Sequence, residues 1–205
     1  MLDMLKSTAE ALLARGYKAI VCENRAQACD YVLSHLKEHA CVGIGGSMTV
    51  KELGLADTLR SAGHEVLWHW ETPPADRPAL LRRVLGEADA YLCSANALCQ
   101  NGTIVEIDGN GNRVAALCYG PEQVFLLVGR NKLVDGTVNQ AIARIKREAC
   151  GKNARRLGLS TPCAVNDRCD AANCRQQCAI TVVLERAPGG GKVVHVLLID
   201  DDLGF

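Results

Sequence analysis

The amino-acid sequence predicts an α/β domain in which a mainly parallel sheet is flanked by helices and followed by a C-terminal antiparallel hairpin. Short apolar runs alternate with helical stretches along most of the chain, and this alternation is typical of βαβ units. The chain has 205 residues, of which 48% are hydrophobic, which is enough to bury one core. Because no internal repeat or low-complexity linker interrupts it, we expect a single domain over 1–205.

In the first half of the chain, apolar residues at helical spacing indicate helices and short apolar runs indicate strands. Helices are expected over 1–16, 25–38, 49–62 and 77–85, and strands over 17–22, 41–44, 65–70 and 88–94. Thr49 and Glu52 have the spacing of a capping box at the start of the third helix, and Gly63 is placed to end it.

The same spacing of apolar residues predicts the helices and strands of the second half of the chain. Strands are expected over 103–107 and 124–128, a strand or a short helix over 113–118, and the longest helix over 137–157. The apolar runs 180–185 and 193–199 flank three consecutive glycines, which predicts a hairpin within 180–200. Residues 158–179, between the long helix and this hairpin, form a polar cysteine-rich loop.

Charge and hydropathy exclude several classes of protein. The 23 Lys and Arg residues balance the 23 Asp and Glu residues, which disfavours nucleic-acid binding. No run of apolar residues is long enough for a membrane span, and the N-terminus lacks the apolar core of a signal peptide. We therefore expect a cytoplasmic protein, whose thiols stay reduced.

A glycine-rich loop is the first candidate for a binding site. Residues 43–49, with the letters GIGGSMT, join a predicted buried strand to a helix. Glycine lets the backbone approach a ligand closely, and free N–H groups at the start of a helix attract anions. The spacing fits neither a Walker loop nor G-x-G-x-x-G. We expect a small anionic ligand here; a tight strand-to-helix turn is the alternative. The residues expected to bind it are Gly45, Gly46, Ser47, Met48 and Thr49.

Small and amide residues in the middle of the chain extend this expected site. Asn96 follows a predicted buried strand, so its side chain is expected to face the same crevice as the glycine loop. Gly102, Asn112 and Arg113 lie in the glycine- and amide-rich stretch that follows, and we include them in the ligand site. Turn formation alone is the alternative interpretation.

The chain has 11 cysteines, and they fall into two groups. Seven are scattered, mostly within apolar runs, and are expected to be small buried side chains. The other four, Cys163, Cys169, Cys174 and Cys178, lie in one polar segment with the spacing Cys-x5-Cys-x4-Cys-x3-Cys. This spacing matches neither zinc knuckles nor ferredoxin motifs, but four thiolates in one loop can converge on a metal. An iron–sulfur cluster, zinc, a disulfide and unliganded thiols all stay open.

Several segments together resemble one known family. Residues 43–55, with the letters GIGGSMTVKELGL, are similar to the glycine motif of the LUD-domain family, the lactate-utilisation proteins. Segments 94–102 and 111–121 resemble its second conserved block, and 128–134 resembles its third. Segments 153–159, 161–163 and 202–205 resemble a subgroup that is common in anaerobes.

This resemblance implies a fold like those of ribose-5-phosphate isomerase, glucosamine-6-phosphate deaminase and the CoA transferases. In those enzymes the glycine loop after an early strand holds phosphate or an equivalent anion. Asn96 stands about where several of those enzymes carry Asp, and an amide cannot act as a general base. Glu106 and Asp108 are the nearest carboxylates. No complete set of acid, base and nucleophile can be assembled, so catalytic residues and turnover stay unassigned.

The resemblance also implies a role as a component of lactate oxidation or related electron transfer, beside iron–sulfur subunits. It therefore favours an iron–sulfur cluster over zinc at the four cysteines. A stand-alone enzyme acting on a phosphosugar, nucleotide or acyl-CoA substrate is one alternative. A non-catalytic regulatory or scaffold subunit with structural zinc is another, and a homodimer stays open.

Overall fold

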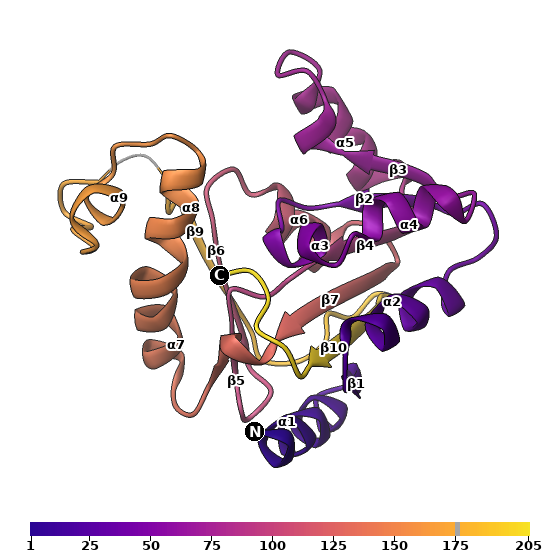
Figure 1. The fold of residues 1–205 in the computed structure, drawn as a ribbon, viewed down its shortest axis with the longest axis horizontal. Coiled ribbons are helices and arrows are strands. Elements are labelled where there is room, and N and C mark those ends of the chain that lie inside the picture. Colours follow the sequence, from indigo (N-terminus) through magenta and orange to yellow (C-terminus); the bar gives the residue numbers. More distant parts are fainter. Residues whose placement is uncertain (175–176) are drawn as a thin grey trace.

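The computed structural model describes residues 1–174 and 177–205 and contains a large and a small sheet (Figure 1). The large sheet has six strands in the order β1-β10-β7-β4-β2-β3, and every neighbouring pair is parallel. The strands are β1 (Lys18–Cys22), β2 (Cys41–Ile44), β3 (Glu65–Trp68), β4 (Ala90–Cys93), β7 (Gln123–Gly129) and β10 (Val193–Ile199). The predicted α/β class with a mainly parallel sheet is confirmed.

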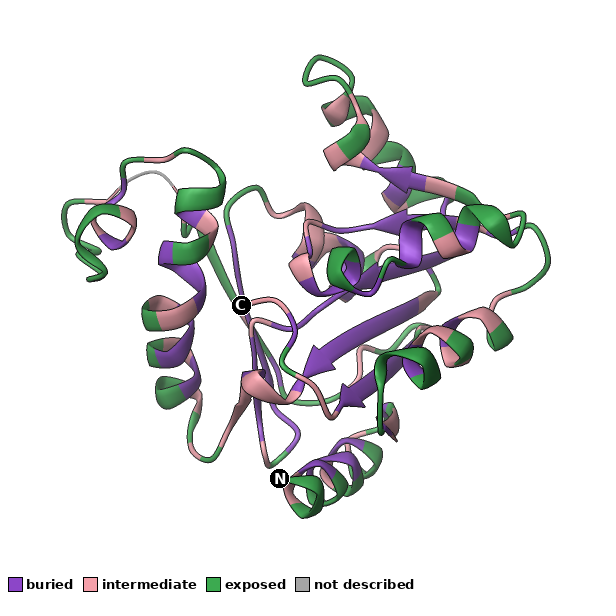
Figure 2. Ribbon diagram, in the orientation of Figure 1, coloured by how far each residue is buried: buried purple, intermediate pink, exposed green. Residues whose placement is uncertain are grey.

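Helices cover both faces of the large sheet. One apolar cluster contains side chains of α1 (Leu2–Ala14), α5 (Arg77–Glu87) and α6 (Asn112–Tyr119). The other contains side chains of α2 (Arg25–Ser34), α3 (Met48–Glu52) and α4 (Leu55–Ser61). Successive residues of a strand face opposite sides of a sheet, and Leu126 and Leu127 of β7 accordingly belong to different clusters. This explains why the central strands are mostly apolar and buried along most of their length (Figure 2).

The small sheet carries the second structural unit of the fold. Its order is β8-β5-β6-β9, with β5 (Ala97–Cys99), β6 (Ile104–Asp108), β8 (Leu133–Val134) and β9 (Ile180–Leu184). A long helical segment packs on it and consists of α7 (Val138–Arg144), a π-helical turn (Ile145–Ala149) and α8 (Cys150–Arg156). The short helix α9 (Pro162–Asn166) follows, at the left of Figure 1. The helix expected over 137–157 therefore exists with a π turn inside it.

The expected C-terminal hairpin is wrong. Strand β9 pairs antiparallel with β6 in the small sheet, whereas β10 lies between β1 and β7 in the large sheet and is parallel to both. Burial explains the difference: β10 is buried from its second residue to its last, as a central parallel strand requires, whereas four of the five residues of β9 are at least partly exposed. The glycines between them carry the chain from one sheet to the other.

The helix expected over 49–62 also differs in detail. It begins at Met48, because Ser47 Oγ caps it by accepting a hydrogen bond from the Val50 N–H at 3.3 Å. Gly54, with a φ of 65°, divides the segment into α3 and α4. Thr49 is not the cap; its hydroxyl is buried and faces the C-terminal residues. Among the described residues, no helix combines the length and the apolar character that a bilayer span requires.

Candidate functional site

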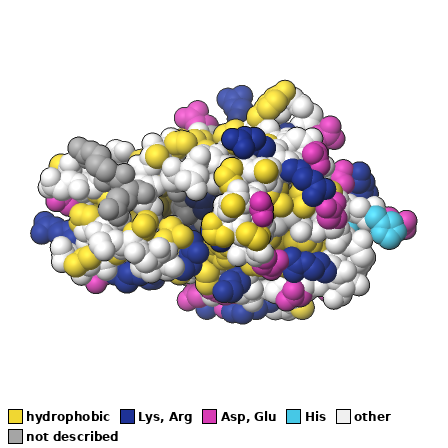
Figure 3. All heavy atoms as spheres, turned by 90° about the horizontal axis from the view of Figure 1, so that it is seen from above, with side chains coloured by type: hydrophobic (Ala, Val, Ile, Leu, Met, Phe, Trp, Pro, Cys, Tyr) yellow, Lys and Arg dark blue, Asp and Glu magenta, His cyan; other side chains and the backbone are white. Residues whose placement is uncertain are grey.

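A polar cavity of about 220 Å³ lies at the carboxyl edge of the large sheet. Its wall includes residues that directly follow three neighbouring strands: Gly46 and Ser47 after β2, Ser94 and Asn96 after β4, and Lys132 after β7. The long helix and the small sheet supply the facing wall, and the surface is hollowed between this part and the main body (Figure 3). In an open α/β sheet this edge is the usual place for a ligand.

Lys132 is a buried cation in this wall. Only 4% of the residue is exposed, and its Nζ donates hydrogen bonds to Thr49 Oγ1 at 2.7 Å and Ser94 Oγ at 2.8 Å. Both partners are neutral hydroxyl groups, so neither balances the charge. Burial, together with the nearby guanidinium of Arg144, lowers the pKa of Lys132 to about 7. The carboxyl groups of Glu106 and Glu52 oppose this shift, and an anion in the cavity would further favour the protonated ammonium.

Sequence reasoning missed Lys132. A signal was available, because this lysine comes four residues after the end of the strongly apolar run 124–128. A charged residue so close to the carboxyl end of a buried strand is well placed to face a crevice. What the sequence could not show is that the side chain turns inward between the hydroxyls of Thr49 on α3 and Ser94 after β4.

The residues of the glycine loop have different roles. Gly46, Ser47 and Met48 line the cavity. Gly45 lies behind them, where a Cβ atom would be 2.5 Å from Tyr91 Oη, so no larger residue fits. Thr49 also lies behind the wall and holds Lys132 through its hydroxyl.

The other predicted ligand residues also differ in whether they line the cavity. Asn96, Asn112 and Arg113 line the cavity. Asn96 Oδ1 accepts hydrogen bonds from the Ile107 N–H and from Arg113 Nη2, both at 2.9 Å, which holds the guanidinium in place. The structure does not bring Gly102 to the cavity. It has a φ of 85° in a turn that packs against α1.

Glu106 is a buried carboxyl group behind Arg113. Its Oε2 lies 3.2 Å from Arg113 Nη2. That nitrogen donates to Asn96 and Ile107, so among the described residues neither Glu106 oxygen accepts a hydrogen bond. Burial raises the pKa of Glu106 to about 7, although Arg113 opposes the shift. Asp108, by contrast, accepts hydrogen bonds from three backbone N–H groups and shapes the turn before α6.

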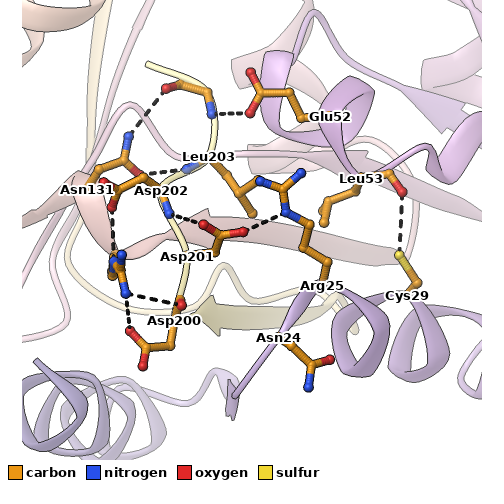
Figure 4. Close-up of polar contacts among 12 residues, drawn as sticks. Asn24, Arg25, Cys29, Glu52, Leu53, Asn131, Asp200, Asp201, Asp202 and Leu203 are labelled. Carbon is orange, nitrogen blue, oxygen red and sulfur yellow. Dashed lines mark hydrogen bonds and ion pairs between the residues drawn. The ribbon is translucent and has the colours of Figure 1, made fainter.

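Polar contacts hold the C-terminal segment beside the cavity (Figure 4), and Phe205 forms part of its wall. Arg130 forms ion pairs at 3.0 Å with both Asp200 and Asp202. Asn131 then accepts a hydrogen bond from the Leu203 N–H at 3.1 Å and donates one to the Gly204 carbonyl at 3.3 Å. These contacts place Gly204 against Thr49 and Lys132, and Phe205 in the cavity wall.

The four predicted metal-ligating cysteines line one neighbouring cavity of about 340 Å³. Cys163 is buried and its Sγ lies 3.2 Å from Thr161 Oγ1, whereas Cys169 and Cys178 are exposed. Among residues 1–174 and 177–205, no group of three or more His, Cys, Asp or Glu side chains is arranged to hold a metal ion. Thiolates suit iron–sulfur clusters and zinc, but these do not converge, so both cofactors stay predictions.

A fifth cysteine lines this cavity. Cys150, which the sequence indicates to be a core residue, is buried, and its Sγ lies 3.4 Å from Cys178 Sγ. Hydrogen bonding from Cys150 lowers the pKa of the Cys178 thiol, and the ammonium of Lys146 has the same effect. The same contact raises the pKa of Cys150.

The fold and the cavity define an α/β domain with a polar, cation-lined cavity at the carboxyl edge of a parallel sheet. The chain belongs to the LUD-domain family, because the family model for the LUD domain matches residues 5–199. The resemblance found in the sequence motifs is thereby confirmed, and with it a relation to lactate-utilisation proteins in general.

One solved structure is similar to this chain over almost its whole length. It is a crystal structure of a DUF162 family protein from Deinococcus radiodurans, with 15% sequence identity, a TM-score of 0.54 and coverage of 97% of each chain. At this identity the similarity shows the fold. None of the curated proteins matches this chain.

Proposed function

We propose that this LUD-domain protein is a component of lactate utilisation that binds a small anionic ligand in the cavity beside Lys132. Family membership supports the general role. The ligand class rests on Lys132, a buried ammonium whose hydrogen-bond partners, Thr49 and Ser94, are neutral. A buried charge is costly unless an opposite charge accompanies it, and a carboxylate or phosphate would provide that charge.

The rest of the cavity wall supports the same ligand class. Arg113 and Arg156 line the cavity in addition to Lys132, whereas Asp108 is already bound by backbone N–H groups. His69 lines the cavity, and its Nδ1 atom is buried without a hydrogen-bond partner among the described residues. Burial lowers the pKa of His69, which favours the neutral ring in the cavity wall.

Thermal unfolding with L-lactate, and separately with inorganic phosphate, tests the proposal. At a ligand concentration a hundredfold above Kd, binding adds about 2.7 kcal/mol of stability, which raises the Tm of a protein of this size by roughly 5–10 °C. Lys132→Met should abolish this rise. Lys51→Met is the matched control, because Lys51 is exposed on α3, and it should behave as the wild type.

Each result has a defined meaning. A rise with lactate supports the whole proposal. A rise with phosphate alone supports the anion site and contradicts lactate as the ligand. An unchanged rise in Lys132→Met overturns the site. If Lys132→Met does not fold, Gly46→Val tests the same wall. The nearest atom to a Cβ at Gly46 is Trp70 Nε1 at 3.4 Å, so a Cβ atom fits there without a steric clash.

Three further expectations from the sequence stay predictions. They are association with iron–sulfur subunits of lactate oxidation, a metal centre at the four cysteines and formation of a homodimer. Iron, sulfide and zinc analysis of anaerobically purified protein tests the metal centre.

A further inference from the structure

We propose that Cys150 and Cys178 form a redox-active dithiol that exchanges with low-molecular-weight disulfides and closes to an intramolecular disulfide. The inference is independent of the anion site and of the lactate role. It competes with the predicted metal centre at Cys163, Cys169, Cys174 and Cys178, since Cys178 Sγ lies 3.4 Å from Cys150 Sγ.

The two sulfur atoms are already close to bonding distance. They are 3.4 Å apart, and a disulfide bond is about 2.0 Å long, so closure needs a movement of about 1.4 Å. Contacts on both sides of Cys178 hold the loop in position. Gln177 Nε2 donates to the Cys150 carbonyl at 3.1 Å, and the Ala179 N–H donates to the Asp108 carbonyl at 3.0 Å.

The two thiols differ in accessibility in the way that an exchange reaction requires. Cys178 is exposed and can meet a disulfide from solution, whereas only 5% of Cys150 is exposed. Lys146, one helical turn before Cys150, lines the same cavity as both thiols. Cys178 is therefore the attacking residue and Cys150 the resolving residue.

The reaction balances with one external disulfide, R–S–S–R. The Cys178 thiolate attacks one sulfur of R–S–S–R, which forms a mixed disulfide and releases R–S⁻. Cys150 then loses its proton, and its sulfur attacks the Cys178 sulfur and displaces the second R–S⁻. Two protein thiols are oxidised by two electrons, and R–S–S–R is reduced to two thiols that take up the two protons.

The dithiol lies where it can affect ligand binding. Cys150 and Cys178 line both the cavity that contains Lys132 and the cavity that contains the other cysteines. Closure of the disulfide would join α8 covalently to the loop before β9 and so alter a wall that the two cavities share.

Peptide mapping after treatment with glutathione disulfide tests the proposal. Full-length protein is reduced, desalted anaerobically, treated with one equivalent of glutathione disulfide, alkylated and digested. The expected result is a fall from 11 free thiols to nine, one cross-linked pair joining Cys150 to Cys178, and full reversal by dithiothreitol. In Cys150→Ser the reaction should stop at a glutathione adduct on Cys178.

Two further variants complete the design. Cys178→Ser should form no cross-link to Cys150, and Cys169→Ser is the matched control, because Cys169 is exposed in the same cavity and its loss should leave the cross-link intact. A cross-link from Cys178 to Cys163, Cys169 or Cys174, or no cross-link, overturns the proposal. Protection of Cys178 by bound iron or zinc that a chelator removes also overturns it. The anion assay is run on the reduced protein, so that its failure and the failure of the dithiol proposal are distinguishable.

Discussion

Lys132 Nζ and Ser94 Oγ lie 2.8 Å apart at the ends of two adjacent strands. Ser94 directly follows β4, Lys132 follows β7, and the two strands are parallel neighbours. The contact exists because parallel pairing brings both carboxyl ends to the same edge of the sheet. The ligand cavity therefore depends on the order of the strands in the large sheet.

The charge on Lys132 should make anion binding depend on pH. Its pKa is about 7 in the folded protein, and the protonated form is the one that attracts an anion. We expect the Kd for sulfate, whose charge is constant in this range, to increase by about tenfold per pH unit above pH 7. Titration calorimetry at pH 6, 7, 8 and 9 measures this. A Kd that is constant from pH 6 to 9 would contradict the assigned role of Lys132.

Gly204 should be required for the arrangement around Lys132. A Cβ atom at Gly204 would lie 2.6 Å from Thr49 Oγ1 and 3.1 Å from Lys132 Nζ. We expect Gly204→Ala to displace one of these groups and to weaken lactate binding at least tenfold, in addition to about 1 kcal/mol of backbone strain from its φ of 62°. Gly190→Ala is the matched control, since Gly190 has a φ of 76° and nothing within 4 Å. Equal lactate affinities in the two variants would disprove the contact.

The carboxyl group of Glu106 should make the free energy of unfolding decrease as pH rises. Its pKa is raised from 4.5 to about 7 in the folded protein, so between these values the folded chain binds more protons than the unfolded chain. The contribution of this group to the free energy of unfolding is therefore complete below pH 4.5. It is lost as pH rises through 7, by at most about 1.4 kcal/mol per pH unit.

Urea unfolding of the wild type and Glu106→Gln at pH 5 and pH 8 tests this sign. The stability of the wild type relative to the variant should fall between the two pH values. A difference that is constant, or that rises with pH, would show that the carboxyl group is ionised throughout.

Gly45 and Gly46 of the glycine-rich loop should respond differently to alanine. Gly45→Ala places a Cβ atom 2.5 Å from Tyr91 Oη and 3.3 Å from Cys93 Cβ, and overpacking of this kind costs about 1–3 kcal/mol. Gly46→Ala meets no atom closer than 3.4 Å and should fold as stably as the wild type. Thermal unfolding of both variants distinguishes them, and equal Tm values would contradict the packing described for Gly45.

Local patterns were sufficient to predict much of the fold. The apolar run 124–128 marked the central strand β7, and the strand–glycine–helix junction at 43–49 identified three residues that line the cavity, Gly46, Ser47 and Met48. The hairpin prediction failed because hairpins were inferred from adjacency along the chain, whereas β10 gains more burial between β1 and β7 than it would beside β9.

By itself, the sequence determined the α/β class, the family and the candidate anion loop, because hydrophobic period, glycine position and motif spacing are local properties of the chain. Tertiary structure alone decided that Lys132 is buried among hydroxyls, that Glu106 lies behind Arg113 and that Cys150 contacts Cys178. The physical reason is that these pairs are separated by 7 to 83 residues. Their distances and their proton affinities depend on which strands pair and on how much water the packing excludes.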